Sequence, residues 1–410
     1  MTTSLTLLRV LRDRDTGLYL TGLVVSGFGT SSLWLASGVW VKELTGSDGL
    51  AALCMLAMWA PTLAGPALGT LADRLPRRPL LIALNLGLAA LLLTLFAVDS
   101  AARLWLLFTV LFLYGTAGVV HDAAESALVS SVVGPDLLGD FNGLRTAVTE
   151  GMKLVAPLTG AGLYTVYGGP AVACLDAATF VLAAGLCALL RVREQRPARS
   201  GEGWRRQTAQ GVRHLWGHPV LRPLVRAGGT TMLLTALAST TVYAVVDRLG
   251  HSPAYTGVLY AAQGAGSVAA GLLAGPALRR LGGRRFAAAG IALTGAAVVA
   301  RAVPWDPVAL GSAAAGGLGL PCVLIAALTA VQRETPGPLL GRVTATAHTL
   351  VFTPNVLGLA TGAGLVELAG PGLLLPLYGL ALLLTALPLA QRAASASRTA
   401  ARSPSDANPA

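Results

Sequence analysis

The sequence predicts an all-α integral membrane protein with twelve transmembrane helices in two pseudo-symmetric six-helix bundles. Of its 410 residues, 54% are hydrophobic and only 12% are charged, and the mean hydropathy is +0.66. A soluble domain is about a quarter charged. A membrane-spanning helix needs about 20 apolar residues, so the chain has room for many spans. Apolar runs of this length recur between short breaks rich in Gly, Pro or charge.

The apolar runs and the polar stretches between them give the expected organisation. The candidate spans are 17–41, 49–72, 79–98, 104–133, 141–166, 170–190, 219–246, 254–278, 286–303, 307–331, 343–367 and 371–391. The expected parts are a cytoplasmic N-terminal segment (1–16), an N-terminal bundle (17–190), a cytoplasmic linker (191–218), a C-terminal bundle (219–391) and a disordered cytoplasmic tail (392–410). The later part of the linker is either a short interfacial helix anchored by Trp204 and Trp216 or a plain charged loop.

The two predicted bundles resemble each other weakly in sequence. The tripeptide Pro-Ala-Leu at 66–68 precedes one basic loop, and the same tripeptide at 276–278 precedes another. Thr-Gly-Ala-Gly-Leu occurs at 159–163 and again at 361–365, in the fifth span of each half. The matched positions give the repeat its value, because transporters are often built from repeated halves.

The distribution of positive charge predicts the topology. With both termini inside, 25 of the 30 Lys and Arg residues fall on the cytoplasmic side. The remaining charges are Lys42, Arg103, Arg248 and Arg301 outside, and Lys153 within a span. Since the arginines sit at helix ends, the net charge of +11 is topogenic and nucleic acid is not an expected partner.

Several function classes are disfavoured. The two lysines follow no glycine, so the chain has no phosphate loop for an ATP-driven pump. The four cysteines lie in apolar runs without disulfide or zinc spacing. The first apolar run is long enough to span, so no cleavable signal peptide is expected. The outer loops are short and carry no catalytic cluster, which disfavours a lipid-modifying enzyme. A non-transporting receptor stays open.

A basic loop between the second and third spans carries the strongest motif. The stretch PALGTLADRLPRRPLL at 66–81 combines a small residue, one carboxylate and a cationic cluster: Gly69, Asp73, Arg74, Arg77 and Arg78. The carboxylate is expected to pair with the arginines of its own loop. The stretch resembles the signature loop of the major facilitator superfamily, with Pro76 where many members carry glycine. The resemblance implies that these residues control conformational change and that the protein is a secondary transporter.

Further stretches extend this resemblance over nearly all of 17–391. The fifth span contains Pro157 and Gly160, and it resembles the fifth-helix motif of the superfamily's antiporters, except that Ala156 replaces the first glycine. The alternative is a packing kink without bearing on direction. Residues 122–144 and 332–343 resemble the bacterial drug- and siderophore-exporter branch. The resemblance therefore favours export.

Four charged residues are predicted to lie at one depth within the fourth and fifth spans, where charges usually face a cavity or one another. Helix rise places Asp122 ~16 Å and Glu125 ~12 Å from the end of the fourth span. It places Glu150 ~14 Å and Lys153 ~18 Å from the start of the fifth span. Each pair is three residues apart and so shares one helix face.

These four residues are the candidates for proton coupling or substrate binding. Three acids against one lysine leave an excess of negative charge, with Glu150 expected to pair with Lys153 and His121 expected to point elsewhere. The alternative is a salt-bridged helix pair that is purely structural. Three further residues could line a cavity: Asp176, His348 and Asn355. The alternative for Asp176 is that it only hydrogen-bonds a neighbour.

The sequence thus predicts a proton-coupled antiporter that exports a small amphipathic or cationic compound by alternating access, as a monomer in the bilayer of a bacterial inner membrane. An importer or facilitator on the same fold is the alternative. No enzymatic activity, cofactor or metal is expected.

Overall fold

The prediction of an all-α protein is confirmed by the computed structural model, which describes residues 14–45, 48–134, 137–191, 204–251 and 255–402. Within these ranges every element is a helix. The chain forms two compact units. Unit 1 comprises the chain up to His218 together with Val331–Thr353, and unit 2 comprises Pro219–Ala330 and the chain from Pro354 onwards.

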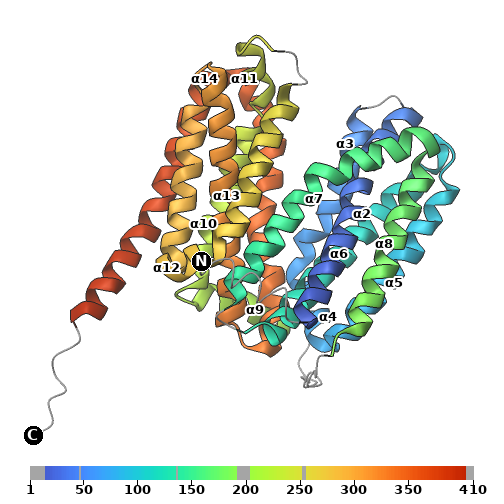
Figure 1. The fold of residues 1–410 in the computed structure, drawn as a ribbon, viewed down its shortest axis with the longest axis horizontal. Coiled ribbons are helices and arrows are strands. Elements are labelled where there is room, and N and C mark those ends of the chain that lie inside the picture. Colours follow the sequence, from blue (N-terminus) through green and yellow to red (C-terminus); the bar gives the residue numbers. More distant parts are fainter. Residues whose placement is uncertain (1–13, 46–47, 135–136, 192–203, 252–254, 403–410) are drawn as a thin grey trace, which may run out of the picture. The chain divides into compact units, whose positions relative to one another are not determined.

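Unit 1 is a helical bundle in which α2 packs against both α7 and α8 (Figure 1). Its elements are α2 (Arg14–Thr45), α3 (Asp48–Trp59), η1 (Ala60–Ala64), α4 (Gly65–Arg74), α5 (Arg77–Leu93), η2 (Thr94–Ala97), η3 (Ala101–Arg103), α6 (Leu104–Val132), α7 (Leu138–Tyr167), α8 (Gly169–Leu189) and α9 (Trp204–Gly217). The core includes Leu33, Leu92, Leu107 and Phe180. Burial of these side chains fixes α2, α5, α6 and α8 around one another.

Unit 2 is built from long helices. Its elements are α10 (Leu221–Ser239), α11 (Val242–Arg248), α12 (Tyr255–Ala300), most of α13 (Asp306–Glu334) and most of α14 (Leu340–Arg402). The end of α13, the short helix η4 (Gly337–Leu339) and the first turns of α14 belong to unit 1. The core of unit 2 includes Ile291, Val323 and Leu382.

Glycines with positive φ mark several of the predicted breaks between spans. Gly168 (φ 77°) separates α7 from α8, while Gly282 (φ 73°) and Gly370 (φ 67°) interrupt α12 and α14. Only glycine adopts this conformation without steric cost. The predicted span 49–72 is divided into α3, η1 and α4. Pro61 lies in η1, and proline lacks the N–H that continues a helix.

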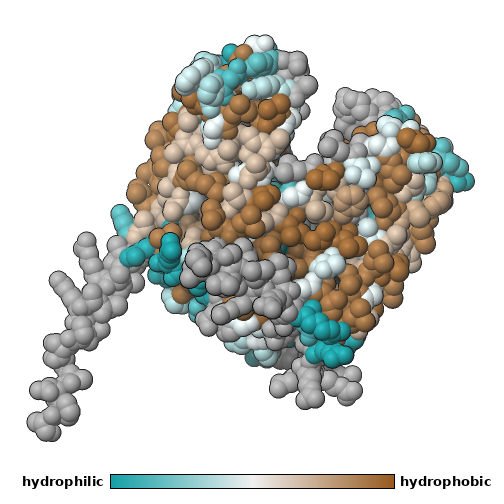
Figure 2. Space-filling model, viewed as in Figure 1, coloured by the Kyte–Doolittle hydropathy of each residue, from teal (hydrophilic) through white to brown (hydrophobic). Residues whose placement is uncertain are grey.

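The helices expose apolar side chains over their flanks (Figure 2). Trp105, Leu368 and Leu384 are 66%, 84% and 65% exposed. Helices long and apolar enough to cross a membrane number seven within the described chain: 14–45, 77–97, 101–130, 169–189, 255–300, 306–334 and 368–391. Exposed apolar surface on spanning-length helices is what a bilayer solvates. Helices α12 and α14 each contain two predicted spans, so the helices do not correspond one to one with the spans. The number of twelve transmembrane helices stays a prediction.

Two segments predicted with less regular structure are helical. Helix α14 continues to Arg402, so the tail expected to be disordered begins as helix, and 403–410 lie outside the described residues. The first residues of the tail are mostly Ala, Ser and Arg, and Ala and Arg are good helix formers. The later part of the linker is helix α9, with Trp216 at its exposed end, 45% accessible.

A single buried carboxylate joins residues 331–353 to the rest of unit 1. Asp73, at the end of α4, accepts hydrogen bonds from the backbone N–H of Gly341 (2.7 Å) and of Arg342 (3.0 Å). The guanidinium Nε of Arg342 donates a third bond to the same carboxylate at 2.8 Å, and both side chains are buried. Arg342 corrects the expectation that Asp73 pairs with arginines of its own loop. Two of those arginines donate to backbone carbonyls, Arg77 to that of Gly337 at 2.9 Å and Arg78 to that of Cys187 at 3.2 Å.

Gly69 permits this joint. A Cβ at Gly69 would lie 2.7 Å from the carbonyl oxygen of Gly341 and 2.6 Å from the Cβ of Ala345. A Cβ at Gly341 would lie 2.6 Å from the carboxylate oxygen of Asp73. The backbones of α4 and α14 therefore meet closely enough for the carboxylate to reach two main-chain N–H groups.

Asp73→Asn should lower the stability of the protein by about 3–5 kcal/mol, because it leaves the buried guanidinium of Arg342 without its counter-charge. The measurement is thermal unfolding of the purified protein in detergent. The matched control is Asp99→Asn, which breaks the exposed ion pair of Asp99 with Arg103 (3.1 Å). That change should cost under about 1 kcal/mol. Equal effects of the two substitutions would refute a stabilising role for the Asp73 joint.

Candidate functional site

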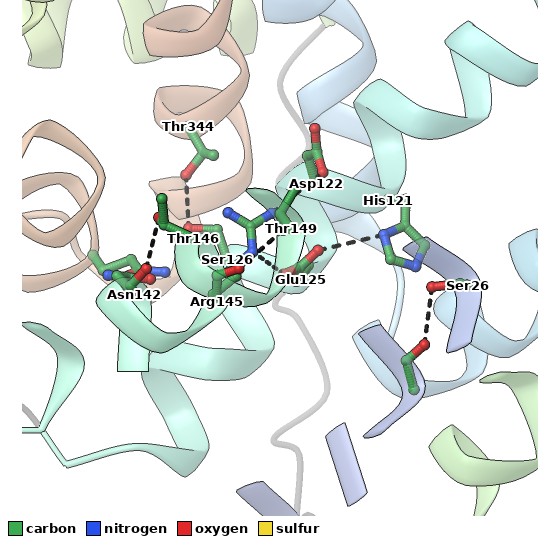
Figure 3. A network of polar contacts seen from close by, with 12 residues as sticks. Ser26, His121, Asp122, Glu125, Ser126, Asn142, Arg145, Thr146, Thr149 and Thr344 are labelled. Atoms are coloured by element: carbon green, nitrogen blue, oxygen red, sulfur yellow. Dashed lines mark hydrogen bonds and ion pairs between the residues drawn. The ribbon is translucent and has the colours of Figure 1, made fainter. Parts of the chain in front are cut away.

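A polar cluster lies inside unit 1, where the C-terminal half of α6 faces the N-terminal half of α7 and the start of α14 (Figure 3). Helix α6 supplies Asp122 and Glu125, α7 supplies Arg145, and α14 supplies Thr344 and His348. The predicted ends of the fourth and fifth spans are confirmed by α6 and α7 within a few residues. The two acids predicted to share a helix face do lie together, facing the same arginine.

The strongest contact in the cluster is the pair between Arg145 and Glu125. The guanidinium Nε lies 2.7 Å from the carboxylate oxygen Oε1, and the Glu125 side chain is only 4% exposed. On its other side, Oε2 of the same carboxylate lies 3.5 Å from Nδ1 of His121. A carboxylate buried to this degree needs such partners, because an uncompensated charge would be expensive in the bundle interior.

Asp122 is held more loosely. Its side chain is 40% exposed and lies 3.7 Å from Nη2 of Arg145. On its other side, Nδ1 of His348 lies 3.6 Å from Oδ2 of Asp122. Asp122 is therefore the more accessible of the two carboxylates, and both of its contact distances exceed the length of a hydrogen bond.

His121 corrects one expectation. The sequence interpretation had it pointing away from the acids, but its Nδ1 lies 3.5 Å from Oε2 of Glu125. The spacing explains this contact, since residues four apart lie on one helix face. The sequence interpretation considered its neighbour Asp122 and overlooked the residue four positions later.

Neutral hydrogen bonds close the cluster toward residues 331–353. The hydroxyl of Thr344 donates to that of Ser126 at 3.2 Å, and the amide of Asn142 donates to the side-chain oxygen of Gln332 at 2.6 Å. All four side chains are buried. Hydroxyls and amides in this position satisfy one another without adding charge.

The residue that sequence reasoning missed is Arg145. It was counted as a topogenic charge at the start of a span, yet it sits between the two acids of α6. Two carboxylates then face one guanidinium, so negative charge remains in excess, as predicted, but Arg145 takes the place given to Lys153. The Lys153 side chain lies outside the described residues, so its pairing with half-buried Glu150 stays a prediction.

The cluster contains one grouping with the spacing of metal ligands. Ligand atoms of His121, Asp122 and Glu125 all lie within 4.8 Å of one another. The guanidinium of Arg145 contacts both carboxylates, however, and repels a cation there. These residues therefore do not fit a divalent metal in this arrangement.

Asp176 of α8 was predicted either to line a cavity or to hydrogen-bond a neighbour, and it makes such hydrogen bonds. It is fully buried and accepts hydrogen bonds from the Tyr114 hydroxyl and the Thr179 hydroxyl, both at 3.2 Å. The Tyr114 hydroxyl in turn contacts that of Thr30 at 2.7 Å. Asp176 thus hydrogen-bonds its neighbours and links α8 with α6.

The remaining predicted residues lie in different units. In unit 1, Gly160 lets α7 approach α2, because a Cβ there would lie 2.6 Å from the carbonyl oxygen of Ser32. The side chain of Pro157 is outside the described residues. His348 and Asn355 were expected on one wall, but His348 belongs to unit 1 beside Asp122, and Asn355 lines a cavity of unit 2.

Comparison with curated proteins finds bacterial efflux proteins. Macrolide efflux protein A of Streptococcus pyogenes is 28% identical over 174 residues, which cover 42% of this chain and 43% of that protein. Macrolide efflux protein A of Enterococcus faecalis is 26% identical over 149 residues, 36% of this chain and 46% of that protein. The match thus spans less than half the length of these relatives.

Solved structures share the whole fold at low identity. A bacterial homologue of the iron transporter ferroportin in an outward-facing state has a TM-score of 0.76 at 17% identity, covering 93% of this chain and 99% of that one. The human organic anion transporter MFSD10 has a TM-score of 0.72 at 18% identity, covering 92% and 99%. Residues 19–246 match the family described as Major Facilitator Superfamily. The chain is a transporter and belongs to the major facilitator superfamily.

Proposed function

We propose that this protein is a proton-coupled antiporter that exports a small amphipathic or cationic compound by alternating access. The observation that carries the proposal is the partly open carboxylate of Asp122 beside a fixed Glu125–Arg145 pair. The similarity to macrolide efflux proteins supports export, although the match covers less than half of their length. A small-molecule substrate and protons would be the partners, with the protein acting as a monomer.

The charges of the cluster divide the work between its two carboxylates. Glu125 is committed to Arg145 at 2.7 Å and lies 3.5 Å from the ring of His121. Asp122 has only the longer contacts to Arg145 and His348. Asp122, assisted by His348, is the group that exchanges a proton for a cationic substrate. A shared site of this kind couples the two because like charges cannot occupy it together.

The joint at Asp73 is the proposed gate. The segment 331–353 comes from the C-terminal half of the sequence but packs within unit 1 through hydrogen bonds to Asp73. Alternating access requires such a joint to break and reform, so Gly69, Asp73 and the nearby arginines (Arg74, Arg77 and Arg78) would set the balance between two states. Pro157 and Gly160 would set the flexibility of α7.

The first prediction concerns coupling. Asp122→Asn should reduce pH-driven flux at least about tenfold while retaining substrate counterflow without a pH gradient, because it removes the proposed proton site and keeps the size of the side chain. The measurement uses proteoliposomes with a macrolide and with ethidium as probes, and Asp99→Asn is the control. Wild-type pH-driven flux in Asp122→Asn would place the coupling site elsewhere.

The same assay separates export from import. An antiporter accumulates the probe only when protons move down their gradient in the direction opposite to the probe. A symporter requires protons to move in the same direction as the probe, and a facilitator requires no pH gradient. Uptake that follows the proton gradient inward would establish the importer alternative.

The second prediction concerns the fixed pair. Glu125→Gln should destabilise the protein by about 3–5 kcal/mol, because Arg145 then faces only the distant carboxylate of Asp122. The double variant Glu125→Gln/Arg145→Gln should recover part of this loss, as expected for two groups that interact directly. Thermal unfolding in detergent provides the measurement. Strictly additive losses would mean that the two side chains do not act as a pair.

The third prediction concerns topology. Both termini and the linker 191–218 should face the cytoplasm, because the positive charges concentrate there. A single cysteine introduced in the linker of a cysteine-free variant should resist impermeant thiol reagents in intact cells and react after permeabilisation. Labelling of intact cells would reverse the orientation.

A further inference from the structure

A cavity of about 180 Å³ lies inside unit 2, between α10, α12, α13 and α14. This volume far exceeds the roughly 10–15 Å³ that one water molecule needs. Apolar side chains form much of the wall, including Met232, Leu259 and Val298. The polar side chains of the wall include Thr235, Ser239, Tyr260, Gln263, Arg301 and Asn355. The cavity thus has the composition of a small-molecule site: mostly apolar, with a few convergent polar groups.

Arg301 gives this cavity its charge. The residue follows the last turn of α12, and its backbone N–H bonds to the carbonyl of Ala297 at 3.0 Å. Its guanidinium turns inward against α13, where Nη2 lies 3.8 Å from the position that a Cβ would take on Gly316. The sequence placed this arginine among the outside topogenic charges, but its side chain lines the interior.

This guanidinium has no carboxylate partner among the side chains that the structure describes. Its Nε is buried and makes no hydrogen bond. Of the described acids in unit 2, Asp306 contacts His251 at 2.9 Å and Asp247 is exposed on α11. Glu367, whose side chain is not described, follows Asn355 by twelve residues on α14, which corresponds to ~18 Å along the helix. Among the described side chains of unit 2, none therefore compensates the charge of Arg301 in this cavity.

We propose that this cavity is an anion-binding site, in which Arg301 takes a compact anion of carboxylate size. The planar guanidinium pairs with a carboxylate through two parallel N–H groups. Gln263 and Asn355 add amide donors on the facing helices, and Tyr260 adds a hydroxyl. An unpaired buried charge costs free energy, and an entering anion removes that cost, which makes binding favourable.

The site gives unit 2 a chemistry opposite to that of unit 1, where carboxylates are in excess. The anion could be the acidic group of a transported compound or a free inorganic ion, and both use the same guanidinium. Binding here requires neither export nor proton coupling, so it can be tested separately from the proposed function.

The experiment measures the melting temperature of the full-length protein in detergent against sodium benzoate, with benzamide as its neutral counterpart. Sodium chloride and sodium sulfate are titrated separately to identify inorganic anions. Benzoate should stabilise the wild type and benzamide should not, since only the former carries the charge. Arg301→Gln should weaken the response about tenfold or more, whereas Arg301→Lys should keep part of it. The matched control is Arg248→Gln, an exposed arginine of the same unit.

The ligand-free melting temperature distinguishes a binding role from a structural one. If Arg301 awaits an anion, Arg301→Gln should unfold at the wild-type temperature or higher, because it removes an unpaired buried charge. Stabilisation by chloride or sulfate alone, lost in Arg301→Gln, would identify an inorganic anion as the ligand and support the site. Two results would overturn it: no response of the wild type to any of these anions, or an equal response in Arg301→Gln.

Discussion

Unit 1 depends on the requirement that a buried carboxylate be fully satisfied. Asp73 receives two main-chain N–H groups and one guanidinium from a segment 268–269 positions away in the sequence. An apolar contact at this point could slide, but three directional hydrogen bonds fix one register between α4 and α14. The contacts of Ser126 and Asn142 with Thr344 and Gln332 follow from that register, because they lie on the same joined segment. The position of His348 beside Asp122 follows as well.

The sequence was sufficient for the helices because their signals are local. Apolar runs fixed where helices form, and glycines and prolines fixed many of the breaks, as at Gly168, Gly282 and Gly370. The partner of Asp73 could not be read in this way. Its own loop offers three arginines, and nothing local favours Arg342 over them.

The site was predictable only in its acids. Asp122 and Glu125 stand out because carboxylates are rare in apolar runs. Arg145 and Arg301 do not stand out, since an arginine near the end of a span has the same local pattern whether it faces lipid headgroups or the bundle interior. The i, i+4 spacing of His121 and Glu125 was the one available signal that went unused. Telling the two kinds of arginine apart requires the fold, because it depends on which helices surround the helix end.

The assignment of 331–353 to unit 1 has a consequence for how this protein could be cut or assembled. A gene divided at the predicted linker 191–218 would separate residues 331–353 from the rest of unit 1. The first fragment would lack the segment 331–353, which supplies the hydrogen-bond partners of Asp73, Ser126 and Asn142. The carboxylate of Asp73 would then lose its partners. The two halves are therefore not autonomous folding modules. The first fragment would need residues 331–353 to be supplied by the second for these hydrogen bonds to form.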